Sequence, residues 1–275
     1  MAALIRLIGI DVDGTLVGAA GVVDPRIWQA AERARAAGVR LSLCSGRPAF
    51  GLALGYAKQL GDGWHSFQNG ASILHLASGR SLSTPLPPAA VSALIARARI
   101  TGRILELYSD TDFVCESSAA WAHAHAALLG IPFAPRAYES LEGGAVVRAQ
   151  WLVAPSDSPG AIADVPEGVE VAESTSPIMP DARFIGITRT GISKGSALRT
   201  IVADYGMSLG EVMYIGDSGN DLSALRIVGY PVAMANADQA VQRAARHIVG
   251  SVDNAGVADA FELAIEENTA TRGSA

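Results

Sequence analysis

The sequence lacks the features that mark several large classes of protein. Its 275 residues include only two cysteines, too few for a disulfide framework and typical of a reducing compartment. No apolar run reaches the roughly 18 residues of a membrane span, and the N-terminus has neither the basic start nor the cleavage site of a signal peptide. We therefore expect a cytoplasmic protein that does not act at a membrane.

Positive charge is also scarce. The 21 Lys and Arg residues are outnumbered by 27 Asp and Glu, which gives a formal net charge of −6. This balance argues against nucleic acid as a partner, and it means that an anionic substrate would need a local positive site. Lys58 and Lys194 are the only lysines. In a chain that otherwise uses arginine, a lysine indicates a need for a compact ammonium group.

The spacing of apolar runs and turn residues predicts two kinds of architecture in one chain. Strands alternate with helices up to about residue 82 and again after about 188, which is typical of a parallel sheet in an α/β fold. Residues 72–86 have hairpin character, and the helices and strands expected from about 83 to 187 indicate a separate α+β unit. We predict a doubly wound, Rossmann-like core from residues 1–82 and 188–275, interrupted by an inserted domain at 83–187.

The most informative motif is Asp11-Val12-Asp13-Gly14-Thr15-Leu16, which follows an apolar run typical of a buried strand. Ligands of open α/β sheets bind at the carboxyl ends of strands. If the strand continues, Asp11 and Asp13 share one side of it, and two such close carboxylates need a cation or a shared proton. The motif therefore predicts a Mg²⁺-assisted site, although a surface turn has the same composition.

A second acidic pair, Asp217 and Asp221, follows the apolar run Val212–Ile215 in a glycine-rich turn. Carboxylate oxygens at the end of a second strand are suitable ligands for a hard cation. Asp221 also stands near a predicted helix start, a position that favours acidic residues without any ligand.

Two further turns carry groups that suit a phosphate. Ser45 and Gly46 follow a predicted strand and precede a predicted helix from about residue 48, so the hydroxyl and nearby N–H groups form a phosphate cradle or an ordinary N-cap. Arg47 adds a possible bidentate clamp for phosphate or substrate. Lys194 stands at another helix start, where an ammonium is unfavourable unless it faces anionic oxygen. A solvated surface lysine is the alternative.

In this order, Asp-x-Asp-Gly-Thr-Leu, Ser-Gly-Arg, Ser-Lys-Gly and Gly-Asp-x-x-Asn-Asp resemble the four motifs of the haloacid dehalogenase (HAD) superfamily. Flanking segments such as Gln68-Asn69-Gly70-Ala71, and the place of the insert between the second and third motifs, resemble the Cof-type, type IIB branch. The resemblance implies the HAD fold for the core and a C2-type cap for the insert.

The resemblance also implies roles for individual residues. Asp11 is the expected nucleophile, and Asp13 the expected acid and base. Mg²⁺ is expected on the Asp11 carboxylate, the Asp13 backbone carbonyl and Asp217, with Asp221 supporting through water. The phosphoryl oxygens are expected on side chains and backbone of the motifs, namely Ser45, Gly46, Lys194 and Asn220.

The sequence thus predicts a Mg²⁺-dependent phosphatase of small phosphorylated metabolites, in particular sugar or polyol phosphates. A phosphomutase of the phosphomannomutase type is an alternative, although its fourth motif usually has a more extended glycine-rich form. A non-catalytic protein that binds phosphorylated metabolites is a third interpretation. Such a protein would be expected to have lost Asp11 or Asp13, and both are present.

Overall fold

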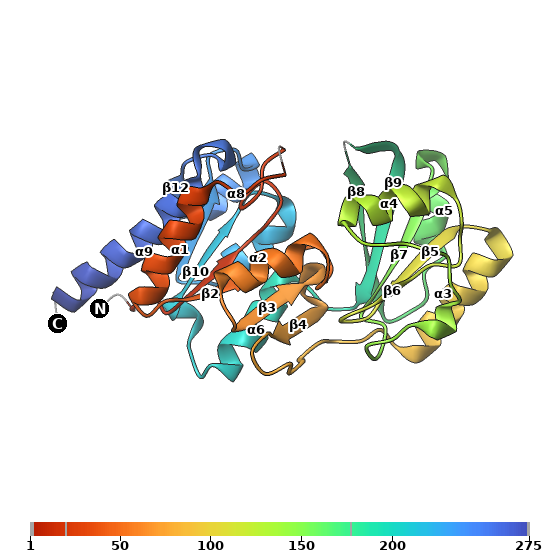
Figure 1. The fold of residues 1–275 in the computed structure, drawn as a ribbon, viewed down its shortest axis with the longest axis horizontal. Helices are drawn as coiled ribbons and strands as arrows, with labels where there is room; N and C mark the ends of the chain where they lie inside the picture. The colour runs from red at the N-terminus through yellow and green to blue at the C-terminus, as the bar shows by residue number, and fades with distance from the viewer. Residues whose placement is uncertain (1–2, 20, 177, 274–275) are drawn as a thin grey trace. The chain divides into compact units, whose positions relative to one another are not determined.

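The computed structural model describes residues 3–19, 21–176 and 178–273, and their contacts divide the chain into two compact units (Figure 1). The first, here called the core unit, comprises Met1–Gly46, Gly55–Leu82 and Ser193–Ala275. The second, the cap unit, comprises Arg47–Leu54 and Ser83–Ile192. The predicted insertion at 83–187 does not include the short segment Arg47–Leu54. This segment groups with the cap because Phe50 packs in a cap cluster and its ring stacks 6.4 Å from that of Tyr108.

The core unit is built on a parallel sheet of five strands in the order β12-β11-β10-β1-β2. Its strands are β1 (Leu7–Ile10), β2 (Arg40–Leu43), β10 (Val212–Gly216), β11 (Tyr230–Met234) and β12 (His247–Val249). Its helices are α1 (Pro25–Ala36), α2 (Leu52–Leu60, which begins in the cap segment), α6 (Lys194–Asp204), α7 (Leu222–Leu225), α8 (Gln239–Ala244) and α9 (Gly256–Gly273). The predicted parallel α/β core is confirmed.

The sequence explains how these elements form. Asp24 accepts a hydrogen bond from the backbone N–H of Arg26 and Pro25 follows it, so α1 begins at the expected cap. Figure 1 shows α1 and α9 side by side next to the sheet. Leu198 and Ile201 of α6 pack in one buried cluster with Tyr214 of β10.

Two predictions for the core were wrong. Residues 64–68 were expected to continue the parallel βαβ pattern, but β3 (Trp64–Phe67) pairs antiparallel with β4 (Ser72–His75) in a separate ribbon. A parallel bridge between Cys44 and Ser66 connects this ribbon to the end of β2. The helix predicted from residue 48 begins at Leu52, so Ser45 and Gly46 lie in a loop rather than at a helix start.

The cap unit contains an antiparallel sheet in the order β6-β5-β7-β9-β8. Its strands are β5 (Ile104–Tyr108), β6 (Phe113–Val114), β7 (Arg148–Val153), β8 (Val169–Ser176) and β9 (Met179–Arg189). Its helices are α3 (Pro88–Thr101), α4 (Ala120–Leu129) and α5 (Ser158–Ala163). Strand β9 was not predicted, because Pro180 and Gly186 count against a strand in the interior of a sheet.

A buried carboxylate lies within the cap sheet. Glu106 is fully buried and accepts hydrogen bonds from the hydroxyl of Tyr108 at 2.7 Å and the side-chain amide of Gln150 at 2.9 Å. Its other oxygen lies 2.9 Å from Nδ1 of His125 on α4. Arg148 in turn donates to the Gln150 side chain. The carboxylate is therefore satisfied by cap residues, as a buried charge requires.

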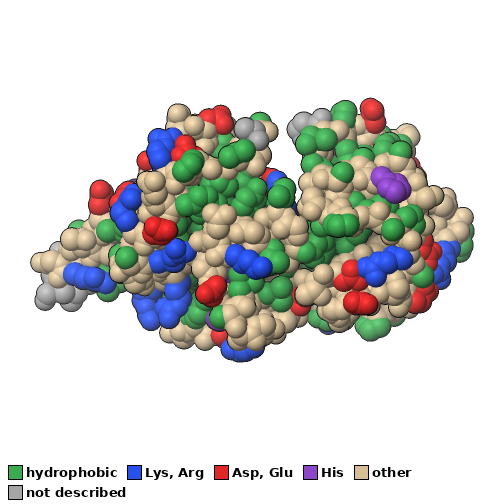
Figure 2. All heavy atoms as spheres, viewed as in Figure 1, with side chains coloured by type: hydrophobic (Ala, Val, Ile, Leu, Met, Phe, Trp, Pro, Cys, Tyr) green, Lys and Arg blue, Asp and Glu red, His purple; other side chains and the backbone are tan. Residues whose placement is uncertain are grey.

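The outer surface carries charges of both signs. On the face in Figure 2, Lys and Arg side chains lie interspersed with Asp and Glu over both units, without a continuous field of either sign among the described residues. Within the described part of the chain, no helix is both long and apolar enough to cross a bilayer.

A buried histidine links β3 to β2. His65 is fully buried; its Nδ1 accepts a hydrogen bond from the backbone N–H of Leu43 at 3.0 Å, and its Nε2 lies 2.8 Å from the carbonyl oxygen of Gly61, to which it donates. Both contacts require the neutral ring with its proton on Nε2. Burial lowers the pKa of His65 to about 4, which keeps this form at neutral pH.

This histidine predicts how stability depends on pH. The pKa of His65 is lower in the folded chain than in the unfolded one, so the unfolded chain binds more protons between about pH 6.5 and 4. We expect this residue to reduce the free energy of unfolding by about 3 kcal/mol as the pH falls through that window. Denaturant unfolding of the wild type and of His65→Gln at several pH values measures this. The variant should be less stable at pH 7 but show a flatter profile, and the same change at exposed His123 is the control. Equal slopes for wild type and His65→Gln would contradict the assignment.

Candidate active site

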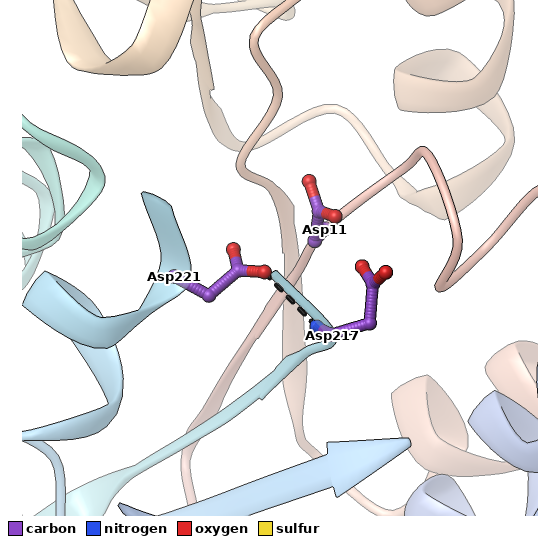
Figure 3. A group of neighbouring side chains, drawn as sticks. All are labelled: Asp11, Asp217 and Asp221. Carbon is purple, nitrogen blue, oxygen red and sulfur yellow. Dashed lines mark hydrogen bonds between the residues drawn. The ribbon is translucent and has the colours of Figure 1, made fainter. Parts of the chain in front are cut away.

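Three carboxylates from two neighbouring strands converge at one edge of the core sheet (Figure 3). Strands β1 and β10 pair in parallel, so their carboxyl ends lie side by side. Asp11 directly follows β1, Asp217 directly follows β10, and Asp221 ends the 3₁₀ turn Gly219–Asp221. Each of the three offers one oxygen, and these oxygens all lie within 4.8 Å of one another. The predicted convergence of two motifs distant in sequence is therefore observed.

Contrary to the prediction from the sequence, Asp13 does not share one side of a strand with Asp11. Strand β1 ends at Ile10, so Asp11 and Asp13 belong to a turn and the two-residue period of a strand does not apply. Asp11 is buried, whereas Asp13 is exposed. The two carboxylates thus have different environments, one enclosed and one open to solvent.

The turn after Asp11 is shaped to hold Asp217. Gly14 has a φ of +83°, and a Cβ at this position would lie only 2.2 Å from an Asp217 oxygen. Glycine is needed here for both reasons. The hydroxyl of Thr15 donates to the other Asp217 oxygen at 3.0 Å. The sequence motif drew attention to its acids, but Gly14 and Thr15 determine where the distant Asp217 lies.

Lys194 connects the carboxylates. It is the first residue of α6, after the N-cap Ser193, and only 1% of it is exposed. Its Nζ donates to Asp11 at 2.5 Å and to Asp221 at 2.7 Å. Burial lowers the pKa of Lys194, but the charges of the two carboxylates outweigh burial and the net shift is upward. The ammonium therefore stays charged inside the protein.

The carboxylates are not fully compensated. Burial raises the pKa of Asp11 well above its usual range, the charge of Asp221 adds to this, and Lys194 opposes it. Burial likewise raises the pKa of Asp217. Three carboxylates and one ammonium leave an excess of two negative charges when all are ionised. An all-oxygen donor set with this excess fits a divalent hard cation such as Mg²⁺.

The predicted phosphate-binding residues lie on neighbouring loops of the core unit. Ser45 is fully buried at the end of β2, and its carbonyl accepts a hydrogen bond from the backbone N–H of Asn69 at 2.9 Å. Asn220 is exposed, and its amide donates to the Asn69 side chain at 3.1 Å. A Cβ on Gly46 would lie 3.3 Å from the same Asn69 oxygen. Arg47 is half-buried and belongs to the cap unit.

Asn69 was not predicted as a site residue. It has a left-handed φ of 55°, uncommon outside glycine, and connects the loop at Ser45 to the turn at Asn220. The only signal in the sequence was the dipeptide Asn69-Gly70, which was read as a turn. An asparagine that adopts this conformation and bridges two loops positions the site without any charge to mark it.

The chain is similar to proteins of a known family. The family model of haloacid dehalogenase-like hydrolases matches residues 8–140 and 169–261. The 5-amino-6-(5-phospho-D-ribitylamino)uracil phosphatase YwtE of Bacillus subtilis is 26% identical over 282 residues, which cover 92% of this chain and 96% of the relative.

Solved structures show the same fold. A haloacid dehalogenase-like hydrolase from Bacteroides thetaiotaomicron is 27% identical, with a TM-score of 0.82 over 94% of this chain and 98% of that one. A HAD subclass IIB sugar phosphatase has a TM-score of 0.76 at 23% identity, over 94% of this chain and 98% of its own. The predicted family, fold class and enzyme class are confirmed: the chain belongs to the haloacid dehalogenase-like hydrolases.

Proposed function

We propose that this hydrolase is a Mg²⁺-dependent phosphatase that cleaves sugar or polyol phosphates through an aspartyl-phosphate on Asp11. One observation carries the proposal: the buried Asp11 carboxylate lies against the Lys194 ammonium at 2.5 Å and within one acidic group with Asp217. A nucleophile, a cation for the phosphoryl oxygens and further cation ligands thus occur together. Phosphoryl transfer depends mainly on such positioning and charge neutralisation.

Asp11 and Asp13 divide the covalent chemistry between them. An Asp11 oxygen attacks phosphorus, and the bond from phosphorus to the ester oxygen breaks. Asp13 donates a proton to the leaving oxygen, then accepts one from the water that hydrolyses the aspartyl-phosphate. The burial of Asp11 and the exposure of Asp13 suit these roles, because the second residue must exchange protons with leaving group and water.

The metal-binding residues in this proposal are Asp11, Asp217 and the backbone carbonyl of Asp13. When bound, Mg²⁺ supplies charge neutralisation for the phosphoryl group. The hydroxyl of Thr15 and the close approach of Gly14 hold Asp217 in its place beside Asp11.

The phosphoryl oxygens are held by cations and dipoles of the core loops. Lys194 contributes its ammonium, Ser45 its hydroxyl, Gly46 its backbone N–H and Asn220 its amide. Asn69 supports this set because it joins the loop of Ser45 to Asn220. Arg47 is a candidate for contacts to the rest of the substrate.

The substrate class is inferred from relatives. The curated relative YwtE is named for a phosphorylated ribityl compound, which is a polyol phosphate, and it matches nearly the whole chain. The subclass IIB sugar phosphatase shares the fold, including a cap of the same kind. Both support a small phosphorylated metabolite as substrate and leave its identity to a substrate panel.

Removal of the nucleophile tests the reaction. We expect the purified protein to release phosphate from p-nitrophenyl phosphate when Mg²⁺ is present and not after EDTA. Asp11→Asn keeps the size of the side chain but replaces the nucleophilic carboxylate by a neutral amide, so turnover should fall by more than about 10³-fold. Circular dichroism should show the fold retained, and Asp62→Asn on the surface is the control. Mg²⁺-dependent turnover by Asp11→Asn would rule out this nucleophile, and isomerisation of a sugar phosphate without phosphate release would indicate a mutase.

The two lysines allow a test of the compact ammonium. In Lys194→Arg the charge is kept, but a planar guanidinium has to fit the space in which Nζ contacts Asp11 and Asp221. We expect kcat/KM to fall by about 100-fold, the order found when one hydrogen-bond donor to a transition-state oxyanion is lost. Lys58→Arg, at the exposed second lysine, should leave kcat/KM unchanged. Full activity in Lys194→Arg would show that charge alone suffices.

A further inference from the structure

A buried tyrosine contacts the group of three carboxylates formed by Asp11, Asp217 and Asp221. Tyr214 is in the middle of β10 and is fully buried. Its hydroxyl donates to Oδ1 of Asp221 at 2.7 Å. The proposed reaction gives this phenol no role. It is nevertheless hydrogen-bonded to Asp221, which in turn is hydrogen-bonded to the ammonium of Lys194.

The neighbouring strand leaves room for the ring. Gly9 of β1 is the register partner of Tyr214, and a Cβ at Gly9 would lie 2.7 Å from the tyrosine Cδ2. Glycine inside a strand normally weakens a sheet, so its occurrence here has a packing reason. The pair Gly9–Tyr214 allows a full aromatic ring to lie in the sheet with its hydroxyl at the site.

The hydrogen bonds of Asp221 show what the phenol does there. Oδ1 accepts from Nζ of Lys194 and from the hydroxyl of Tyr214, both at 2.7 Å. Oδ2 accepts from the backbone N–H groups of Asp217 and Ser218, both at 3.0 Å. A carboxylate has about four acceptor positions, so protein donors already occupy all of them. Asp11 accepts a hydrogen bond from Lys194 and Asp217 accepts one from Thr15, and the two carboxyl groups also contact each other. Each therefore has fewer protein donors than Asp221.

We propose that Tyr214 is a positioning residue that acts through Asp221. By completing the hydrogen bonds of Asp221, the phenol fixes the Lys194 ammonium against Asp11 and keeps the Asp221 oxygens engaged with the protein rather than with a metal ion. The metal ligands are then Asp11 and Asp217, and Asp221 serves the phosphate-binding lysine. This inference rests on the proposed function for its catalytic consequence, whereas the arrangement of the side chains does not.

The alternative is that Tyr214 only fills the core. Tyr214→Phe distinguishes the two, because it keeps the ring against Gly9 and removes the hydroxyl. Tyr230→Phe is the matched control: Tyr230 lies on the adjacent strand β11, is also buried, and its hydroxyl donates to the backbone carbonyl of Ala3 at 2.5 Å, away from the acidic group.

Three quantities are measured for the wild type and both variants. They are the dissociation constant of inorganic phosphate in the presence of Mg²⁺ by calorimetry, kcat for p-nitrophenyl phosphate, and the Mg²⁺ concentration for half-maximal activity. For Tyr214→Phe we expect weaker phosphate binding and lower kcat, each by about tenfold, as for the loss of one hydrogen bond to a charged group. The Mg²⁺ half-saturation should change much less than phosphate binding, because the Tyr214 hydroxyl donates to Asp221 and not to Asp11 or Asp217, the proposed metal ligands. Tyr230→Phe should lower only the melting temperature.

Several results would overturn the proposal. Phosphate binding and kcat equal to the wild type would leave Tyr214 as a core residue, and a Mg²⁺ half-saturation shifted as much as phosphate binding would make Asp221 a metal ligand. If the wild type binds phosphate but hydrolyses no ester, the proposed function fails and the binding comparison still decides this inference. Crystal structures of the wild type and Tyr214→Phe decide it without any ligand, because an unmoved Lys194 Nζ would contradict the positioning role.

Discussion

The rest of the core depends on the ion pairs that the buried ammonium of Lys194 forms with two carboxylates. The ammonium lies between Asp11, which follows β1, and Asp221, which lies in the turn after β10, and Lys194 is itself the first residue of α6. A buried charge that loses its partner costs about 3–5 kcal/mol. Three segments distant in sequence must therefore be in place together, so the same contacts that stabilise the fold also assemble the site.

The parallel sheet explains why these segments meet. Parallel pairing of β1 with β10 and with β2 brings the carboxyl ends of three strands to one edge. Each strand is followed by a turn that carries a polar side chain, namely Asp11, Ser45 or Asp217. The sheet thus brings motifs that are distant in sequence close together. Residues of the turns, such as Thr15 and Asn69, then fix the positions of Asp217 and Asn220 through hydrogen bonds.

This division of labour accounts for what could be predicted from the sequence. The parallel core could be predicted because strands alternate with helices along the chain. The proximity of Asp11 and Asp217 could be predicted because each follows an apolar strand, and the carboxyl ends of parallel strands lie on one side of the sheet. Strand β9 could not be predicted, because tertiary pairing outweighs the local effect of Pro180 and Gly186. Thr15, Asn69 and Tyr214 were not found as site residues, since neutral side chains that act on other side chains leave no charge pattern to read.

The number of protein donors differs between the carboxylates with structural contacts and those to which we assign a reactive role. Glu106 in the cap accepts from Tyr108 and Gln150 and contacts His125, and Asp221 in the core has four donors. Such groups have little capacity left for a ligand. Asp11, which is buried, and Asp217, which is half-buried, have fewer protein donors, and burial together with the charge of Asp221 raises the pKa of both. In the proposed function, the cation and the phosphoryl group therefore bind where fewer protein donors occupy the carboxylate oxygens, at the carboxyl ends of β1 and β10.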